Sequence, residues 1–96
     1  MTSKFKIIKT YSLSKDLRGY HFIEPKTGRK MISAFISSSG AGEIFEWDTG
    51  ITETFTEPTD CFCDYSFLVK HVNNLMYNGK AKAGYNSDAE TMWFEV

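Results

Sequence analysis

The stretch TEPTDCFCDYSFLVKHVNNLMYNG, residues 56–79, is the part of the chain in which apolar residues recur with a helical period. A spacing of i, i+4, i+7, i+11 and i+14 places side chains on one helix face, and it is met by Cys61, Tyr65, Leu68, Val72 and Leu75. Polar residues at 59–60 can cap the start, and Asn78-Gly79 is typical of a helix end. The pattern predicts one long amphipathic helix over about residues 60–78.

The segments on either side of this helix alternate polar and apolar residues, as half-buried strands do. Residues 4–13 are predicted to form one strand. Hairpins are predicted around KTGRK (26–30) and around DTG (48–50), because glycine tolerates the positive φ that tight turns require. A last hairpin is predicted within 80–96, around NSDA, and the Ser- and Gly-rich residues 37–42 are predicted to be a flexible loop.

A three-residue connection at DTG determines which side chains share a face of the second hairpin. Phe45 and Trp47 then point to the same side, and we expect Ile51 and Phe55 to meet them there. The order of strands, helix and two further strands predicts an α+β fold. In it a small antiparallel sheet built from hairpins has the long helix packed on one face, followed by a C-terminal hairpin. Residues 1–96 are expected to form a single domain.

Composition favours a soluble, cytoplasmic protein. The chain has 42% hydrophobic and 24% charged residues, which are ordinary globular values. Its first residues lack the apolar core of a signal peptide, and no apolar run approaches the length of about 20 residues that spans a membrane. Cys61 and Cys63 are the only cysteines, and residues two apart rarely form a framework disulfide, so both are expected to be reduced thiols.

Charge is unevenly distributed along the chain. Residues 1–30 carry eight basic and two acidic side chains, whereas residues 31–96 carry three basic and ten acidic ones. The range 42–64 holds seven carboxylates and no Lys or Arg, interleaved with aromatic rings. Either these acids are simply solvated, or they present a surface to a basic protein. The residues predicted to contact such a partner are Glu43, Glu46, Trp47, Asp48, Glu53 and Phe55.

The basic N-terminal third allows an alternative interpretation, in which the chain binds nucleic acid or a small nucleotide. Lys4, Lys6 and Lys9 follow one another on the first predicted strand, where they could contact phosphates. The residues predicted to form this alternative site are Lys26, Arg29, Lys30 and Tyr20, with the basic side chains on phosphates and the ring stacked on a base.

Catalytic, metal and cofactor sites are not expected. The chain has none of the common nucleophile or zinc-protease motifs, and only His21 and His71 as histidines. Cys61 and Cys63 point about 200° apart on a helix and cannot face one metal ion, and Asp64 with His71 lacks a clear third ligand. SSSGAG lacks the residues that end a phosphate-binding loop.

The resulting prediction is a small non-enzymatic binding protein, most consistent with a protein-docking inhibitor or accessory factor. Compact, aromatic-rich chains without motifs are common among such proteins of phages and mobile elements. A homo-oligomer is a further alternative, because a short sheet has edges that a second copy could cover.

Overall fold

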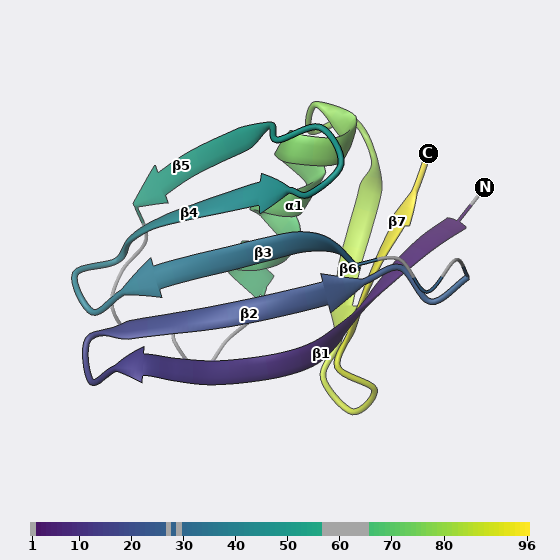
Figure 1. Cartoon of the computed structure of the whole chain (residues 1–96). Coiled ribbons are helices and arrows are strands. Elements are labelled where there is room, and N and C mark those ends of the chain that lie inside the picture. Colours follow the sequence, from purple (N-terminus) through teal and green to yellow (C-terminus); the bar gives the residue numbers. More distant parts are fainter. Residues whose placement is uncertain (1, 27, 29, 57–65) are drawn as a thin grey trace.

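The structure is a computed structural model, and it describes residues 2–26, 28, 30–56 and 66–96. These residues are mostly β. They form one curled antiparallel sheet of seven strands, in the order β5-β4-β3-β2-β1-β7-β6, with one helix inside its curve (Figure 1). The elements are β1 (Thr2–Ser14), β2 (Leu17–Ile23), β3 (Lys30–Ser37), β4 (Ala41–Glu46), β5 (Thr52–Thr56), α1 (Ser66–Tyr77), β6 (Lys82–Asn86) and β7 (Thr91–Glu95).

The predicted α+β fold, a small sheet with a long helix on one face, is therefore wrong. The helix has 12 residues, and the predicted residues 60–65 lie outside the described residues. Its end was predicted correctly, because Asn78 and Gly79 follow it with φ of 54° and 75°. The C-terminal hairpin is also confirmed, as β6 and β7. Helical spacing identifies one face of a helix and gives no measure of how much of the chain the surrounding strands occupy.

β1 is the strand at which the sheet turns its corner. Residues 2–6 pair with β7, and residues 6–14 pair with β2. The register shifts between Ile7 and Lys9, so that Ile8 is an extra residue in the ladder. Such a β-bulge bends its strand and increases the local twist. In Figure 1, β6 and β7 accordingly run steeply across the direction of β2–β5.

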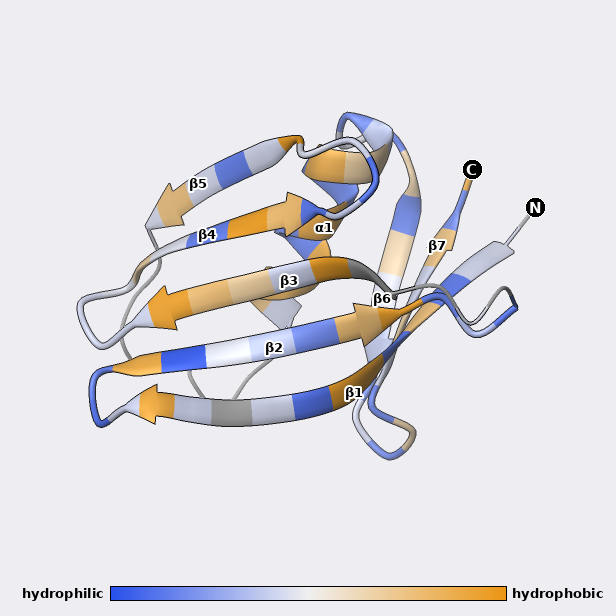
Figure 2. Cartoon of the chain, viewed as in Figure 1, coloured by the Kyte–Doolittle hydropathy of each residue, from blue (hydrophilic) through white to orange (hydrophobic). Residues whose placement is uncertain are grey.

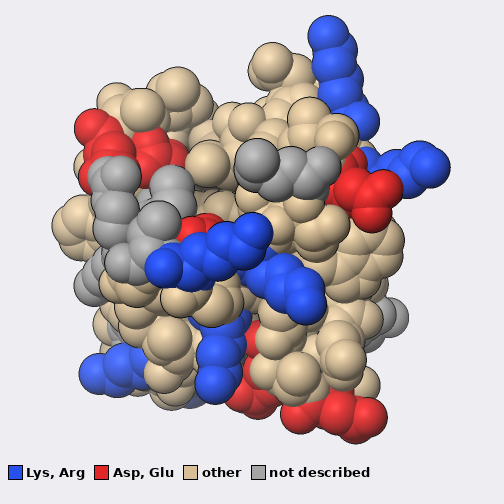
Figure 3. Space-filling view, turned by 90° about the vertical axis from the view of Figure 1, so that its right-hand side faces the viewer, with Lys and Arg blue, Asp and Glu red and all other residues tan. Residues whose placement is uncertain are grey.

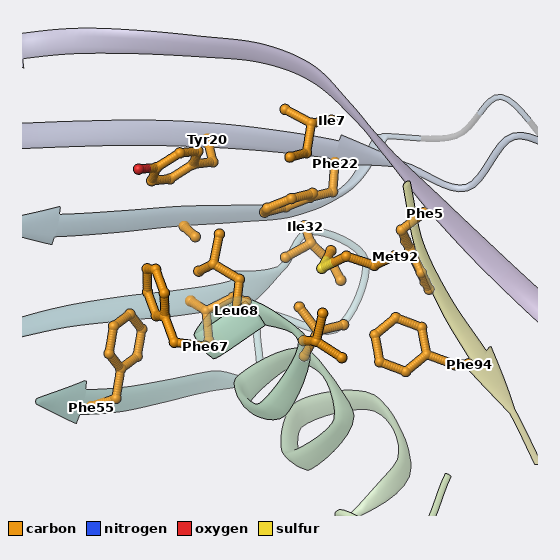
Figure 4. Close-up of a cluster of buried hydrophobic side chains, with 14 of the residues drawn as sticks. Phe5, Ile7, Tyr20, Phe22, Ile32, Phe55, Phe67, Leu68, Met92 and Phe94 are labelled. Carbon is orange, nitrogen blue, oxygen red and sulfur yellow. The ribbon is translucent and has the colours of Figure 1, made fainter. Parts of the chain in front are cut away.

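The inner face of the sheet, which is turned toward α1, carries the core. Hydrophobic and hydrophilic residues are interleaved along the strands (Figure 2), as expected for a sheet with one buried face. Figure 4 shows the buried side chains turned toward one another, with Leu68 of the helix among the strand residues. The strands contribute Phe5, Ile7, Tyr20, Phe22, Ile32, Ala34, Ile36, Ile44, Phe55, Met92 and Phe94. The described side chains of the opposite, outer face are mostly half-buried or exposed.

The positive φ predicted at two glycines is confirmed, and one predicted loop is wrong. Gly28 and Gly50 have the expected positive φ, at 67° and 72°. Residues 37–42 are not a loop, because β3 continues to Ser37 and β4 begins at Ala41. The short turn between them is tied to the neighbouring turn by a hydrogen bond of 2.7 Å from the Ser38 amide to the Asp16 carbonyl. Polar composition therefore does not distinguish a flexible loop from a short turn that is fixed by hydrogen bonds.

The hairpin of β4 and β5 also differs from the prediction, because residues 47–51 connect the strands in place of three residues. Thr52 consequently lies opposite Phe45, and Phe55 lies opposite Gly42. A shift of one position turns every side chain of a strand to the other face. Phe55 therefore packs inside, and it does not share the outer face with Phe45 as predicted.

Candidate functional site

Glu46, predicted to contact a partner, is a structural residue. Its side chain is 4% exposed, and its two carboxylate oxygens accept the backbone N–H groups of Asp48 at 2.8 Å and of Thr49 at 2.7 Å. Carboxylates satisfy backbone donors more strongly than neutral acceptors do. Glu46 therefore closes the five-residue turn that follows β4, and this turn is what sets the register of the hairpin.

Glu53 and Phe55 lie on the inner side of the sheet, against α1. A Glu53 carboxylate oxygen lies 3.2 Å from the Asn74 amide nitrogen and 3.8 Å from His71 Nδ1. The Phe55 ring stacks on the His71 ring, with centroids 4.2 Å apart. Of the six predicted residues, Glu43 and Trp47 are exposed on the outer side, and Asp48 is exposed in the turn after β4.

Trp47 is the most prominent of these exposed residues. It is 48% exposed, at the first position of the turn after β4. Its indole nitrogen donates a hydrogen bond of 2.9 Å to the Ser33 hydroxyl, which is fully buried in β3. Its ring also packs on Phe45, with centroids 5.2 Å apart. A large ring that is half exposed and yet held in one position is typical of an interface anchor.

Ser33 links Trp47 to His21 on the next strand. His21 Nδ1 lies 2.7 Å from the Ser33 hydroxyl oxygen. Because an indole N–H can only donate, the Ser33 oxygen accepts from Trp47 and can still donate its own hydrogen to His21. A Ser–His pair can serve nucleophilic catalysis, but Ser33 has no exposed surface on which a substrate could react. The pair therefore positions Trp47. We name Phe45, Trp47, Ser33 and His21 the aromatic patch.

A groove adjoins the aromatic patch on the same face. It has a volume of about 570 Å³ and is mainly apolar. Register places Phe35 of β3 directly opposite Glu43 of β4, one alternation away from the pair of Ser33 and Phe45. Patch and groove therefore form one continuous strip. The groove is lined by Leu13, Leu17, Phe35, Ser37, Ala41, Gly42, Glu43 and Thr54.

The alternative basic site is not assembled as predicted. Tyr20 is fully buried in the core, where it cannot stack on a base. Lys26 lies with its ammonium 3.4 Å from the Thr2 carbonyl oxygen. Arg29 and the side chain of Lys30 lie outside the described residues. At the end of the molecule that carries the chain termini, Lys and Arg side chains are interspersed with Asp and Glu (Figure 3).

The bulge in β1 assembles a different basic row. Strict alternation would place Lys9 on the face opposite to Lys4 and Lys6, but the extra residue Ile8 returns it to their side. Lys9 pairs with His21 and Lys4 pairs with Trp93, so both lie on the outer face. We name Lys4, Lys6 and Lys9 the lysine row.

Sequence reasoning missed Ser33 and the groove. A serine within a strand carries no signal of its own, and its contact with Trp47 spans 14 residues. The groove collects side chains from five strands, which only the register brings together. The half-exposed Leu13 is the one local hint, because it breaks the polar run that ends β1.

The described residues contain neither a metal-ligand cluster nor a membrane-spanning helix. Within residues 2–26, 28, 30–56 and 66–96, no group of three or more His, Cys, Asp or Glu side chains is placed to hold a metal ion. In the same part of the chain, no helix has the length and apolar character needed to cross a membrane. Cys61, Cys63 and Asp64 lie outside it.

No protein-family model matches this chain, and no curated protein or solved structure matches it either. A functional proposal therefore rests on the residues of the outer face.

Proposed function

We propose that the chain is a small, non-enzymatic, cytoplasmic binding protein that docks on another protein, as an inhibitor or accessory factor. The docking surface is the outer face of β3 and β4, with Trp47 as its anchor. This proposal retains Glu43, Trp47 and Asp48 from the acidic, aromatic-bearing surface inferred from sequence. It replaces Glu46, Glu53 and Phe55 with Phe45 and the groove.

The observation that supports docking most directly is the tethering of Trp47. An exposed ring held by Ser33 and Phe45 loses little conformational freedom when a partner covers it, and preorganised groups of this kind contribute most to affinity. The exposed Glu43, on the same face as the patch, favours a partner with a basic surface.

Affinity capture with matched variants tests the proposal. Wild-type protein, Trp47→Ala and Ile8→Ala serve as baits in nuclease-treated lysate, and bound proteins are quantified by mass spectrometry. Ile8 is a suitable control because it is 49% exposed and lies on β1, three strands away from β4, which Trp47 follows. We expect a stoichiometric protein that wild type and Ile8→Ala retain and Trp47→Ala loses. Equal recovery on all three baits would exclude Trp47 as the anchor.

Nucleic-acid or nucleotide binding is a second candidate function, favoured by the lysine row. Three lysines on the outer face of β1 lie two ladder positions apart, since the bulge absorbs the extra residue, and their backbone positions recur at about 7 Å. This spacing suits successive phosphates of single-stranded nucleic acid. Trp93, across from Lys4, offers a half-buried ring for stacking. The site differs from the hairpin residues inferred from sequence, because Tyr20 is in the core.

A labelled single-stranded oligonucleotide, titrated across a salt series, tests this second candidate. Changing Lys4, Lys6 and Lys9 to Gln should weaken binding and reduce the salt slope by about 2, at roughly 0.7 per phosphate contact. The control changes three exposed lysines elsewhere, Lys70, Lys80 and Lys82, to Gln. Equal losses of affinity in the two triple variants would mean that the oligonucleotide responds only to the net charge of the protein.

A further inference from the structure

Glu43 differs from the other described glutamates on or beside β2–β5, which are Glu24, Glu46 and Glu53. Glu46 is committed to its turn, the Glu24 carboxylate accepts a hydrogen bond of 3.1 Å from the Lys26 amide, and Glu53 faces α1. Glu43 is exposed, and among the described residues its carboxylate makes no hydrogen bond or ion pair. It is thus available for a partner outside the chain.

The surroundings of Glu43 are apolar. Phe35 lies opposite it on β3 and Thr54 opposite it on β5. Within the described residues that line the groove, Glu43 carries the only charge. A carboxylate covered by an apolar ligand would lose its hydration without compensation, at a large cost in free energy. An occupant that covers this groove must therefore bring a cation to Glu43.

We propose that the groove takes one large apolar side chain of a partner protein, and that Glu43 pairs with an Arg or Lys beside that side chain. This inference rests on the proposed docking function and specifies the chemistry of its partner. A volume of about 570 Å³ accommodates such a side chain with part of its neighbours. Arginine suits the site best, because its planar guanidinium pairs with a carboxylate through two hydrogen bonds and tolerates an apolar surface.

The partner segment runs along the strip from the groove to the aromatic patch. From Ala41 to Trp47 the strip covers seven residues, or six steps of nearly extended chain, and is about 20 Å long. An extended peptide of similar length can place its apolar residue in the groove, its cation at Glu43 and a further contact on Trp47. Nucleic acid or an anionic lipid is disfavoured at this strip, because either would bring negative charge to Glu43.

A random-peptide display library selected on the wild-type protein tests the inference. Selected peptides should carry an apolar residue within two positions of an Arg or Lys. They should lose binding to Leu13→Asp, a variant expected to fold because Leu13 is 50% exposed on the rim of the groove. Glu95→Gln, an exposed acid on β7, serves as the matched control for changes at Glu43.

The decisive measurement is a double-mutant cycle on the best selected peptide. Replacing its Arg by the uncharged citrulline should weaken binding to the wild type about tenfold, the effect of losing a charge-assisted hydrogen-bonded pair. The same replacement should change binding to Glu43→Gln much less, and Glu95→Gln should behave as wild type. Equal losses on wild type and Glu43→Gln would overturn the inference, as would a library that yields no peptide sensitive to Leu13→Asp.

Failure of this inference can be told apart from failure of the docking function. Peptides or captured proteins whose binding depends on Trp47 but not on Leu13 or Glu43 would support docking at Trp47. They would exclude the groove as part of the binding site. Binding that none of the three variants affects would overturn both. Selection of acidic or cation-free sequences would also overturn the inference, since such sequences do not complement Glu43.

Discussion

Trp47 donates its indole N–H to the hydroxyl of Ser33, so a ring that is half exposed at a turn is tethered to a fully buried residue in the middle of β3. The tether matters because the hydroxyl is held in place by the sheet, and not by the turn. The position of the ring therefore depends on the register of β3 with β4, in which Ser33 lies opposite Phe45. Register errors that expose the core would also misplace the anchor.

Replacing Ser33 with Ala should release the Trp47 ring. We expect a loss of about 1 kcal/mol in the free energy of unfolding, the typical net value of one hydrogen bond. Trp47 fluorescence, measured in a Trp93→Phe background, should shift to longer wavelength and lose anisotropy. Ser12→Ala, a change at an exposed position of β1, is the control and should leave both signals unchanged. An unaltered Trp47 spectrum in Ser33→Ala would show that Phe45 alone holds the ring.

Replacement by Gln should lower stability at one glutamate of β4 and leave it unchanged at another. Glu46→Gln weakens the bonds from the amides of Asp48 and Thr49, and should cost about 1–2 kcal/mol of unfolding free energy, since bonds to charged groups are worth about 1.5–3 kcal/mol. Glu43→Gln should leave stability unchanged, because its carboxylate makes no such bond to the part of the chain that the structure describes. Urea denaturation of both variants measures the difference. Equal stabilities would contradict a structural role for Glu46.

Substitutions at Phe55 and Trp47 should affect stability differently, because Phe55 lies in the core and Trp47 on the surface. Phe55→Ala removes a buried ring stacked on His71 and should destabilise the protein by about 3–5 kcal/mol. Trp47→Ala should cost far less stability, because the ring is half exposed, while it should abolish docking. Thermal unfolding of the two variants side by side checks this order. A reversed order would return Phe55 to the interface, as its sequence context suggested.

Two glycines should tolerate alanine to different degrees. A Cβ at Gly42 would lie 2.5 Å from the backbone oxygen of Phe35 and 2.7 Å from the ring of Phe55, so Gly42→Ala should cost about 1–3 kcal/mol. The three atoms nearest to a Cβ at Gly84 all belong to the half-buried side chain of Trp93, at 2.6 Å, and no backbone atom is among them. Gly84→Ala should therefore change Trp93 fluorescence more than stability. Chemical denaturation with fluorescence detection reports both quantities, and a larger stability loss at Gly84 would refute the comparison.

The features that sequence predicted well are local ones. Gly28 and Gly50 were recognised as turn positions because positive φ strongly favours glycine, and the helix end was recognised at Asn78-Gly79 for the same reason. The strands followed from alternation of apolar residues. Each of these signals lies within a few residues of the structure it specifies.

The features that sequence could not predict depend on register. Alternation of Phe5 and Ile7 with Lys4 and Lys6 places Ile7 in the core, but it does not reveal that Ile8 is an extra residue. The bulge that places Lys9 therefore cannot be predicted from the pattern. The length of the turn after Glu46 depends on a buried carboxylate that the sequence alone does not distinguish from a surface acid. From that error followed the wrong face for Phe55, and with it part of the predicted docking surface.

The pairing of β1 with β7 has a mechanical consequence. Thr2 lies opposite Glu95, so the outer ends of two antiparallel neighbours are adjacent, at the side of the molecule where both termini emerge (Figure 1). A force that pulls these ends apart acts parallel to the inter-strand hydrogen bonds, which run perpendicular to the strands, and breaks them one after another (an unzipping geometry). A force applied along the strands would load the whole ladder at once. The protein should therefore yield at low force when stretched between these two ends, and β7 should separate from β1 before the strands of the docking face are disturbed.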